Sequence, residues 1–187
     1  MQVTAEEFSS TRHELPDGGR WTELVEGRPV VLDPPDEIYG TIVLNLSKAI
    51  GTAMRADRSI DAAPCFDLGI QTLHDPDTIR FPAAVAFRGG DRFGEVGEVI
   101  ADRVPEVAIE IAADPQRRLH CAERILEYHD AGVGAVWVID PHEQALTIAP
   151  REGLPAIYRE DDPLVPLIDL ELAVTIEDLF AIPKWYR

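Results

Sequence analysis

Cysteine is scarce in this sequence, which contains only Cys65 and Cys121. They lie far apart and no further cysteine accompanies them, so they support neither a disulfide framework nor a zinc cluster. Long apolar runs are also lacking. No stretch reaches the roughly 18 residues of a transmembrane helix, so we expect no membrane partner. The N-terminal MQVTAEEF lacks the basic and apolar regions of a signal peptide. Together these absences predict a cytoplasmic protein.

Basic residues are few relative to acidic ones. The 187 residues include 17 Lys and Arg against 34 Asp and Glu, which gives a formal net charge of -17. A nucleic-acid-binding protein normally presents a basic face, because neutralising phosphates drives its affinity. We therefore expect no tight, general binding to DNA, although Arg117 and Arg118 could form a local basic patch. The length predicts a single domain over residues 1–187.

The spacing of apolar residues predicts helices and a hairpin. RWTELVEGRPVVLD predicts a β-hairpin that turns at Glu26 and Gly27. A helical period predicts helices over about residues 37–54 and 115–131, and the capping residues Thr4 and Thr175 predict short helices near the two ends. In the helix over residues 115–131 we expect these side chains to point inward: Leu119, Ala122, Ile125, Leu126 and His129.

Apolar segments elsewhere predict strands, namely FDLGIQTL, IRFPAAVAF, VAIEIAA, GAVWVID, ALTIA and PAIYR. The order strand, helix, strand across residues 107–140 is a crossover unit, which joins parallel strands. We therefore predict an α/β fold with one mixed central sheet flanked by helices on both faces. An N-terminal helix and the β-hairpin would precede this sheet.

One carboxylate, that of Glu110, lies inside the apolar stretch VPEVAIEIAADP. Strand alternation places Val107, Ile109 and Ile111 on a core face. Glu110 falls on the opposite face among small alanines, as expected for the floor of a cleft. The alternative is that Glu110 reaches solvent at the end of the strand.

Several motifs together resemble one family. TELVEGRPV, VAIEIAADP, ERILEYHDAGVGAVWVIDP and LELAVTIEDLF occur in the order and rough spacing of the Uma-two family, once described as a domain of unknown function. The resemblance extends from about Val3 to Ile182. That family belongs to the PD-(D/E)XK nuclease superfamily, so the resemblance implies a restriction-endonuclease-like fold and hydrolysis of DNA phosphodiesters.

The resemblance also implies site residues. The early acid of the family falls on Glu23, its strand acid on Glu110, its metal-binding Asp on Ala83, and its Lys on Arg124. A frequent His of the family falls on Tyr39. Such nucleases hold Mg²⁺ between carboxylates, and the metal activates the attacking water. The catalytic candidates are therefore Glu110, Arg124 and Glu23, and Glu110 and Glu23 are the candidate Mg²⁺ ligands.

Two positions depart from the family pattern. Ala83 has no side-chain oxygen, and Arg124 stays protonated at any working pH, so it cannot act as a base. The sequence therefore predicts a degraded nuclease site and a non-catalytic protein with a role in interaction or weak nucleic-acid binding. The alternative is a slow Mg²⁺-dependent endonuclease with a relocated ligand. Asp67 or Asp77 could replace the missing acid, although acids beside proline in HDPDT are typical of a turn.

The environment of the retained acids has two interpretations. Arg117, Cys121, Arg124 and Tyr128 share one helix face by their spacing, so they could border a cleft above Glu110. Alternatively, and this we favour, Arg124 forms an ion pair with Glu110 that satisfies a buried charge without a metal. Glu23 could face the same cleft or solvent. A homodimer is an expected assembly for such a domain.

Overall fold

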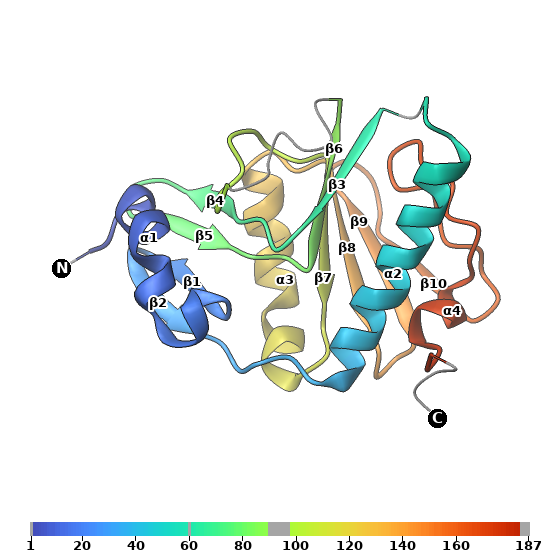
Figure 1. The fold of residues 1–187 in the computed structure, drawn as a ribbon, viewed down its shortest axis with the longest axis horizontal. Coiled ribbons are helices and arrows are strands. Elements are labelled where there is room, and N and C mark those ends of the chain that lie inside the picture. Colours follow the sequence, from blue (N-terminus) through green and yellow to red (C-terminus); the bar gives the residue numbers. More distant parts are fainter. Residues whose placement is uncertain (1, 60, 90–97, 184–187) are drawn as a thin grey trace.

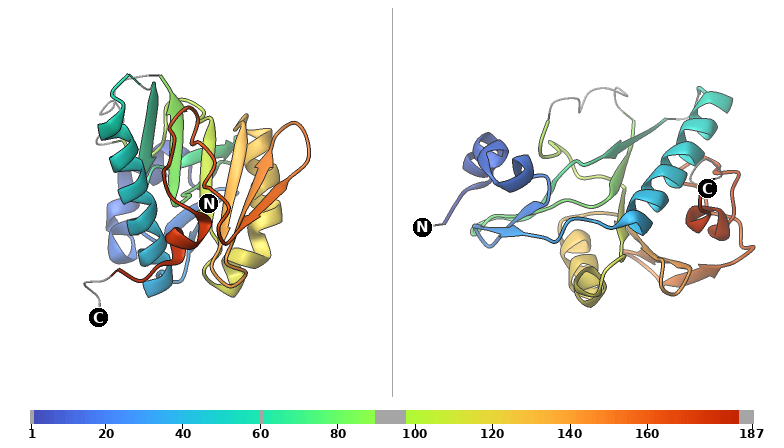
Figure 2. Two further views of the ribbon diagram at one scale, coloured as in Figure 1. Left: turned by 90° about the vertical axis from the view of Figure 1, so that its right-hand side faces the viewer. Right: turned by 60° about the horizontal axis from the view of Figure 1, so that its bottom comes forward.

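The fold has three layers around a six-stranded sheet. The computed structural model describes residues 2–59, 61–89 and 98–183. Helix α2 (Glu37–Ala56) covers one face of the sheet and helix α3 (Pro115–Asp130) covers the other (Figures 1 and 2). A second, four-stranded sheet lies beside the first at the N-terminal side of the molecule (Figure 1). The predicted α/β class is confirmed, with two sheets in place of one.

The six-stranded sheet contains the predicted crossover. Its strand order is β10-β9-β8-β7-β6-β3, and the β7–β8 pair is parallel while the other pairs are antiparallel. Helix α3 connects β7 to β8, as the strand-helix-strand order predicts. The strands are β3 (Ala62–Phe66), β6 (Ala84–Arg88), β7 (Val107–Ile111), β8 (Ala135–Asp140), β9 (Ala145–Pro150) and β10 (Ala156–Arg159).

The four-stranded sheet is antiparallel, with the order β2-β1-β5-β4. The predicted hairpin forms its outer half, with the turn at Glu26 and Gly27, which have φ of 47° and 72°. Such left-handed conformations are favoured in tight hairpin turns. The strands are β1 (Thr22–Val25), β2 (Arg28–Val31), β4 (Ile70–Leu73) and β5 (Thr78–Arg80).

Two predicted strands are each divided between the sheets. FDLGIQTL breaks after β3, where Asp67 takes a left-handed φ of 55°, before β4 begins. IRFPAAVAF breaks between β5 and β6 at Pro82, which has no N–H to donate to a ladder. The prediction of continuous strands was wrong because these short interruptions leave the apolar pattern intact. Residues near both breaks lie where the two sheets meet.

Short helices occupy both ends of the described chain. Helix α1 (Ala5–Thr11) begins with the predicted capping box, in which Thr4 accepts from the Glu7 N–H and Glu7 accepts from the Thr4 N–H. Helix α4 (Ile176–Phe180) has the same motif between Thr175 and Asp178, also as predicted. Two 3-10 turns that the sequence did not predict, Arg12–Glu14 and Pro16–Gly19, connect α1 to β1. Within the described residues, no helix combines the length and apolar character needed to cross a membrane.

Both faces of β7 are buried. Ile109 and Ile111 pack in a core cluster with Leu46 of α2, whereas Ala108 packs on the other side with Tyr128 of α3. Helix α3 covers part of the face of Glu110, and Glu110 also lines a cavity at this face. Glu110 itself is only 6% exposed, so the alternative that it reaches solvent is wrong.

Helix α3 turns its polar side inward. Leu119 and Leu126 are 77% and 64% exposed, and Ala122 is also exposed, so the predicted inward positions of these three are wrong. Ile125 and His129 are half-buried. Arg124 and Tyr128 are the buried residues of the helix. Burying a leucine contributes about 1.5–3 kcal/mol. A buried carboxylate left without a partner is unfavourable by about 3–5 kcal/mol, which favours the observed orientation.

Candidate functional site

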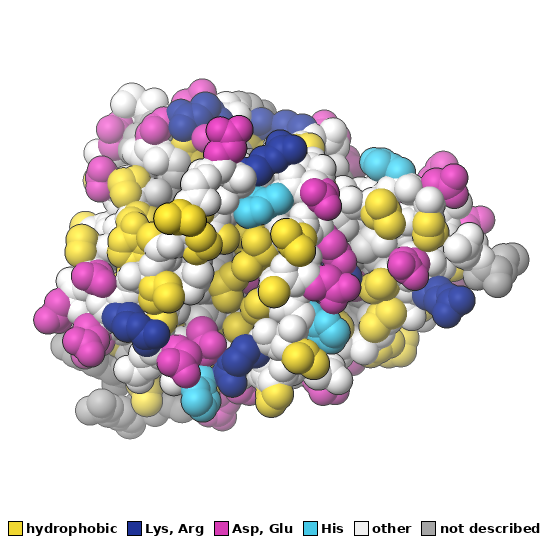
Figure 3. Space-filling model, turned by 180° about the vertical axis from the view of Figure 1, so that it is seen from behind, with side chains coloured by type: hydrophobic (Ala, Val, Ile, Leu, Met, Phe, Trp, Pro, Cys, Tyr) yellow, Lys and Arg dark blue, Asp and Glu magenta, His cyan; other side chains and the backbone are white. Residues whose placement is uncertain are grey.

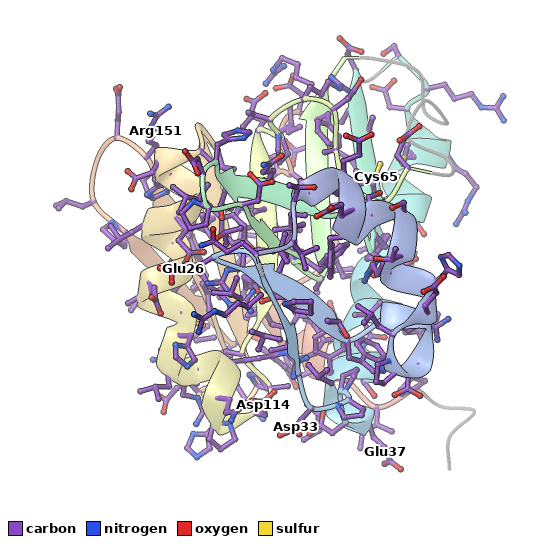
Figure 4. The ribbon with its side chains drawn as sticks, turned by 90° about the vertical axis from the view of Figure 1, so that its left-hand side faces the viewer. Glu26, Asp33, Glu37, Cys65, Asp114 and Arg151 are labelled. Atoms are coloured by element: carbon purple, nitrogen blue, oxygen red, sulfur yellow. The ribbon has the colours of Figure 1, made fainter. Side chains whose placement is uncertain are left out.

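The retained acids meet where the two sheets adjoin. Glu23 comes from β1 of the four-stranded sheet and Glu110 comes from β7 of the six-stranded sheet. Both line a cavity of about 230 Å³, together with Arg124 of α3. Arg117 donates to the Asp33 carbonyl and pairs with Asp114, so the start of α3 lies beside the end of β2 (Figure 4). The site is therefore assembled from both sheets and one helix.

Arg124 bridges the two acids. Its Nη1 donates to Oε1 of Glu110 at 3.0 Å, and its Nη2 donates to Oε2 of Glu23 at 2.7 Å. The predicted ion pair with Glu110 is confirmed. The second contact shows that Glu23 faces the same interior, where its side chain is 1% exposed, so the solvent-facing alternative is wrong. One guanidinium thus satisfies two carboxylates from different sheets.

A second arginine, Arg80 of β5, completes the network. Its Nη1 donates to Oε2 of Glu23 at 3.0 Å, and its Nε and Nη2 each donate to Glu127 at 2.7 Å. The backbone N–H of Phe81 donates to Oε1 of Glu23 at 3.1 Å. Neither Arg80 nor Glu127 was predicted as a site residue from the sequence. The position of Glu127 was predictable, because it lies one helical turn from Arg124. The position of Arg80 at a strand end was not, because the sequence predicts an unbroken strand over 79–87.

Two tyrosines face Glu110. The Tyr128 hydroxyl donates to Oε1 of Glu110 at 2.5 Å. Burial, and after it the charge of Glu110, raises the pKa of Tyr128 well above its ordinary value. The same two causes raise the pKa of Tyr39 to about 12. Tyr39 lines the cavity, and both hydroxyls remain protonated at neutral pH.

Arg124 remains a cation in this setting. Burial alone lowers its pKa, but the carboxylates of Glu110 and Glu23 outweigh burial and raise the pKa above the ordinary value of arginine. A proton-accepting role for this side chain is therefore excluded. A guanidinium can bind an anion, but the positive charge of Arg124 is already balanced by its contacts with two carboxylates.

Of the three remaining candidate positions, Ala83 and Asp67 line the cavity and Asp77 does not. Ala83 lines the cavity at 7% exposure and presents only a methyl group. Asp67 also lines the cavity, with an ion-pair distance of 3.8 Å to Arg12. Asp77 accepts from the Ala5 N–H at 2.6 Å and from Gln71 at 2.9 Å, which confirms its interpretation as a turn residue.

A Mg²⁺ ion does not fit the residues present. Mg²⁺ requires several hard oxygen ligands in an octahedron. Both oxygens of Glu23, and Oε1 of Glu110, already accept hydrogen bonds from cationic or neutral donors. Among the described residues, no three His, Cys, Asp or Glu side chains form a group that could hold a metal. The guanidinium of Arg124 also places a positive charge between the two candidate ligands.

The family of the chain follows from comparison with known proteins. The family model Uma2, described as "Putative restriction endonuclease", matches residues 6–178. The chain belongs to the Uma2 family. No curated protein matches it.

A solved structure shares the fold of this Uma2 chain. This chain is similar to the "crystal structure of a putative nuclease belonging to DUF820 from Anabaena variabilis ATCC 29413", with a TM-score of 0.72. The sequence identity is 23%, over 95% of this chain and 97% of that chain. At this identity the likeness shows the fold alone. The sequence resemblance and the nuclease-like fold are thereby confirmed.

Proposed function

We propose that this Uma2 protein keeps a nuclease fold without hydrolysing phosphodiesters, and acts through interaction with other macromolecules. The observation that carries the proposal is the double contact of Arg124 with Glu110 and Glu23. In the resemblance to PD-(D/E)XK nucleases, these two acids would hold Mg²⁺ and the arginine position would carry a lysine. Here both acids accept hydrogen bonds from one permanent cation.

Three chemical requirements of metal-assisted hydrolysis are missing together. Ala83 lines the cavity with Glu23 and Glu110 but has no side-chain oxygen that could bind a metal. Arg124 cannot accept a proton from water. Arg80 and Arg124 both donate to Oε2 of Glu23, and Arg124 also donates to Oε1 of Glu110, so these two oxygens are not free for Mg²⁺. Any one of these departures would weaken a metal site, and together they support a non-catalytic role.

A weak contact with nucleic acid fits the charge distribution better than tight binding. Arg20 and Arg117 line the cavity, so a phosphate could approach basic groups there. Arg117 is paired with Asp114, and the net charge of the chain is -17. Because phosphate neutralisation drives nucleic-acid affinity, such a surface supports only salt-sensitive, low-affinity binding.

Nicking of supercoiled plasmid in Mg²⁺ and in Mn²⁺ tests the proposal. The native protein and Glu110→Gln, which keeps the side-chain shape, are assayed in parallel after circular dichroism confirms that both are folded. We expect no nicking above a mock purification for either protein. Metal-dependent nicking by the native protein that is lost in Glu110→Gln would overturn the proposal.

A second candidate is a slow endonuclease with a relocated metal ligand. Among the described residues, Oε2 of Glu110 accepts no hydrogen bond, and Asp67 lines the same cavity. These two oxygen sources favour this alternative. It requires that Asp67→Asn abolish metal-dependent nicking, whereas Asp77→Asn, a turn residue outside the cavity, leaves it unchanged.

A further inference from the structure

The cavity where the two sheets adjoin contains an acceptor that the protein itself does not use. Glu110 lines the cavity and is only 6% exposed. Its Oε1 accepts from Arg124 and Tyr128, whereas Oε2 accepts no hydrogen bond among the described residues. Within those residues, the polar side-chain atoms that lack a partner and are also sealed from solvent belong to Thr22 and Thr72. Oε2 of Glu110 is therefore reached through the cavity and can accept from a bound molecule.

The walls of this cavity are rich in aromatic rings. Four half-buried aromatic residues line it, namely Trp21, Tyr39, Phe66 and Phe81. Trp21 packs against none of the three core clusters of the described chain. The hydrophobic core therefore does not explain its position, whereas a ligand in the cavity would. Aromatic side chains of this kind stack on planar heteroaromatic rings.

We propose that the cavity binds one nucleobase that carries an exocyclic amino group, such as adenine. The amino group donates to Oε2 of Glu110, and the ring stacks on the aromatic wall that includes Trp21. The cavity volume of about 230 Å³ lies below the roughly 300–1,000 Å³ of pockets that enclose drug-sized ligands, so it suits a single ring system. An acceptor that faces a ligand selects a donor there and disfavours a second acceptor.

The phosphate of such a nucleotide then lies at the mouth of the cavity. Arg20 and Asp67 line the cavity and are exposed, so it opens to solvent beside them. Asp67 lies 3.8 Å from Arg12, and Arg117 is paired with Asp114. Within the described residues, the Arg20 side chain has no hydrogen bond or ion pair, which leaves its guanidinium available to a phosphate.

The surface charges favour contact with a single base over contact with a duplex. On the face shown in Figure 3, Lys and Arg side chains are scattered among Asp and Glu, and the described residues form no continuous basic band there. Binding along a duplex depends on such a band, because neutralising many phosphates drives the affinity. The inference deepens the proposed function, since it rests on a cavity that binds a nucleotide without hydrolysing it.

Calorimetric titration of the full chain in EDTA tests the contact with Glu110. Adenosine 5′-monophosphate (AMP) should bind with a Kd on the order of 100 μM. Purine riboside 5′-monophosphate, which differs from AMP only in lacking the amino group, should bind at least about tenfold more weakly. No binding of AMP, or equal binding of the two nucleotides, would overturn the inference. Neither result would touch the lack of hydrolysis, which the nicking assay measures separately.

Glu110→Gln changes the chemistry at this position and keeps the shape of the side chain. The amide oxygen can replace Oε1 as the acceptor for Arg124 and Tyr128, so the amide NH₂ takes the place of Oε2. This group donates to a ring nitrogen of either nucleotide, and the preference for AMP should therefore be lost. A folded variant that keeps the tenfold preference would show that the amino group contacts another residue.

Trp21→Ala tests the aromatic wall and leaves the buried ion pairs in place. Loss of a stacked ring should raise the Kd for AMP by about tenfold. Leu119→Ala is the matched control, because Leu119 is 77% exposed on α3 and does not line the cavity. Circular dichroism checks that both variants are folded. Equal affinities of the two variants for AMP would contradict stacking on Trp21.

Two further ligands locate the phosphate and identify the source of the base. Adenosine should bind more weakly than AMP, and Arg20→Gln should remove this difference; a difference that persists would exclude Arg20 as the phosphate partner. Single-stranded tetra-adenylate that binds more tightly than AMP would assign the base to a strand. Tetra-adenylate that binds no more tightly would assign the cavity to a free nucleotide.

Discussion

Arg124 donates from Nη1 to Oε1 of Glu110 at 3.0 Å, with both side chains less than a tenth exposed. The two residues are 14 positions apart and come from adjoining elements, α3 and β7. Truncating one member of a buried ion pair leaves an uncompensated charge, which is far more destabilising than the pair is stabilising. The pair therefore gives a direct test of the site through protein stability.

We expect Arg124→Met to destabilise the protein by about 3–5 kcal/mol, because Glu110 and Glu23 each lose a charged partner. Urea unfolding followed by circular dichroism measures the loss. Arg118→Met is the matched control on the same helix, since Arg118 pairs with Asp140 at a partly exposed site. Its effect should stay below about 1 kcal/mol. Equal losses in the two variants would contradict the buried network.

Tyr128→Phe removes the hydroxyl that donates to Glu110 at 2.5 Å and keeps the packing of the ring. The carboxylate then loses a buried donor, so we expect a destabilisation of about 1–3 kcal/mol. Tyr158→Phe serves as a comparison, because Tyr158 is a half-buried tyrosine of β10. Its unfolding midpoint in urea should shift little. A Tyr128→Phe protein as stable as the native one would show that this hydrogen bond contributes nothing.

Alkaline pH should destabilise the protein through its buried tyrosines. The pKa of Tyr39 rises to about 12 in the folded state, whereas an unfolded tyrosine has a pKa near 10. Above about pH 10 the unfolded state binds fewer protons than the folded state, so stability falls as the pH rises. The contribution of Tyr39 is complete below about pH 10 and is lost towards pH 12, by up to about 1.4 kcal/mol per pH unit.

Comparison of Tyr39→Phe with the native protein isolates this contribution, because the other titrating groups are common to both. Urea unfolding between pH 9 and pH 12 should give a shallower decline for Tyr39→Phe. Parallel declines would mean that Tyr39 titrates normally in the folded protein.

Replacing both departures from the family pattern should create metal binding. Ala83→Asp with Arg124→Lys supplies an oxygen and removes the fixed guanidinium bridge. Mg²⁺ should then raise the melting temperature, as a ligand at about 100 times its Kd stabilises the folded state by about 2.7 kcal/mol. Ala83→Asp alone keeps Arg124 and should respond less. An equal rise in the melting temperature of the native protein would show that the present residues already hold the metal.

The regular elements were predictable because their patterns are local. The hairpin at Glu26 and Gly27, helix α2 and the capping boxes at Thr4 and Thr175 follow from turn residues, apolar period and capping chemistry. The parallel β7–β8 pair follows from the helix between the two strands. Each of these features depends on residues close together in the sequence.

The inward side of α3 was not predictable from apolar spacing. That pattern assumes that leucines face the core, but two acids from different sheets lie beneath the helix and require Arg124 and Tyr128. The role of Arg80 was missed for a related reason, because its partners Glu23 and Glu127 are distant in the sequence. The ion pair of Arg124 with Glu110 was predictable because the spacing of Arg124 and Tyr128 places both side chains on one helix face.

The bridge from Glu23 to Glu110 through Arg124 also has a dynamic consequence. It connects β1 to β7, two strands that belong to different sheets and share no hydrogen-bonded ladder. Local opening of either strand removes one of the two carboxylates that Arg124 bridges and disturbs the pairing of the other carboxylate. We therefore expect β1 and β7 to open in one cooperative event. Amide hydrogens of β1 and β7 should therefore exchange with solvent at matched free energies, and substitution of Arg124 should separate them.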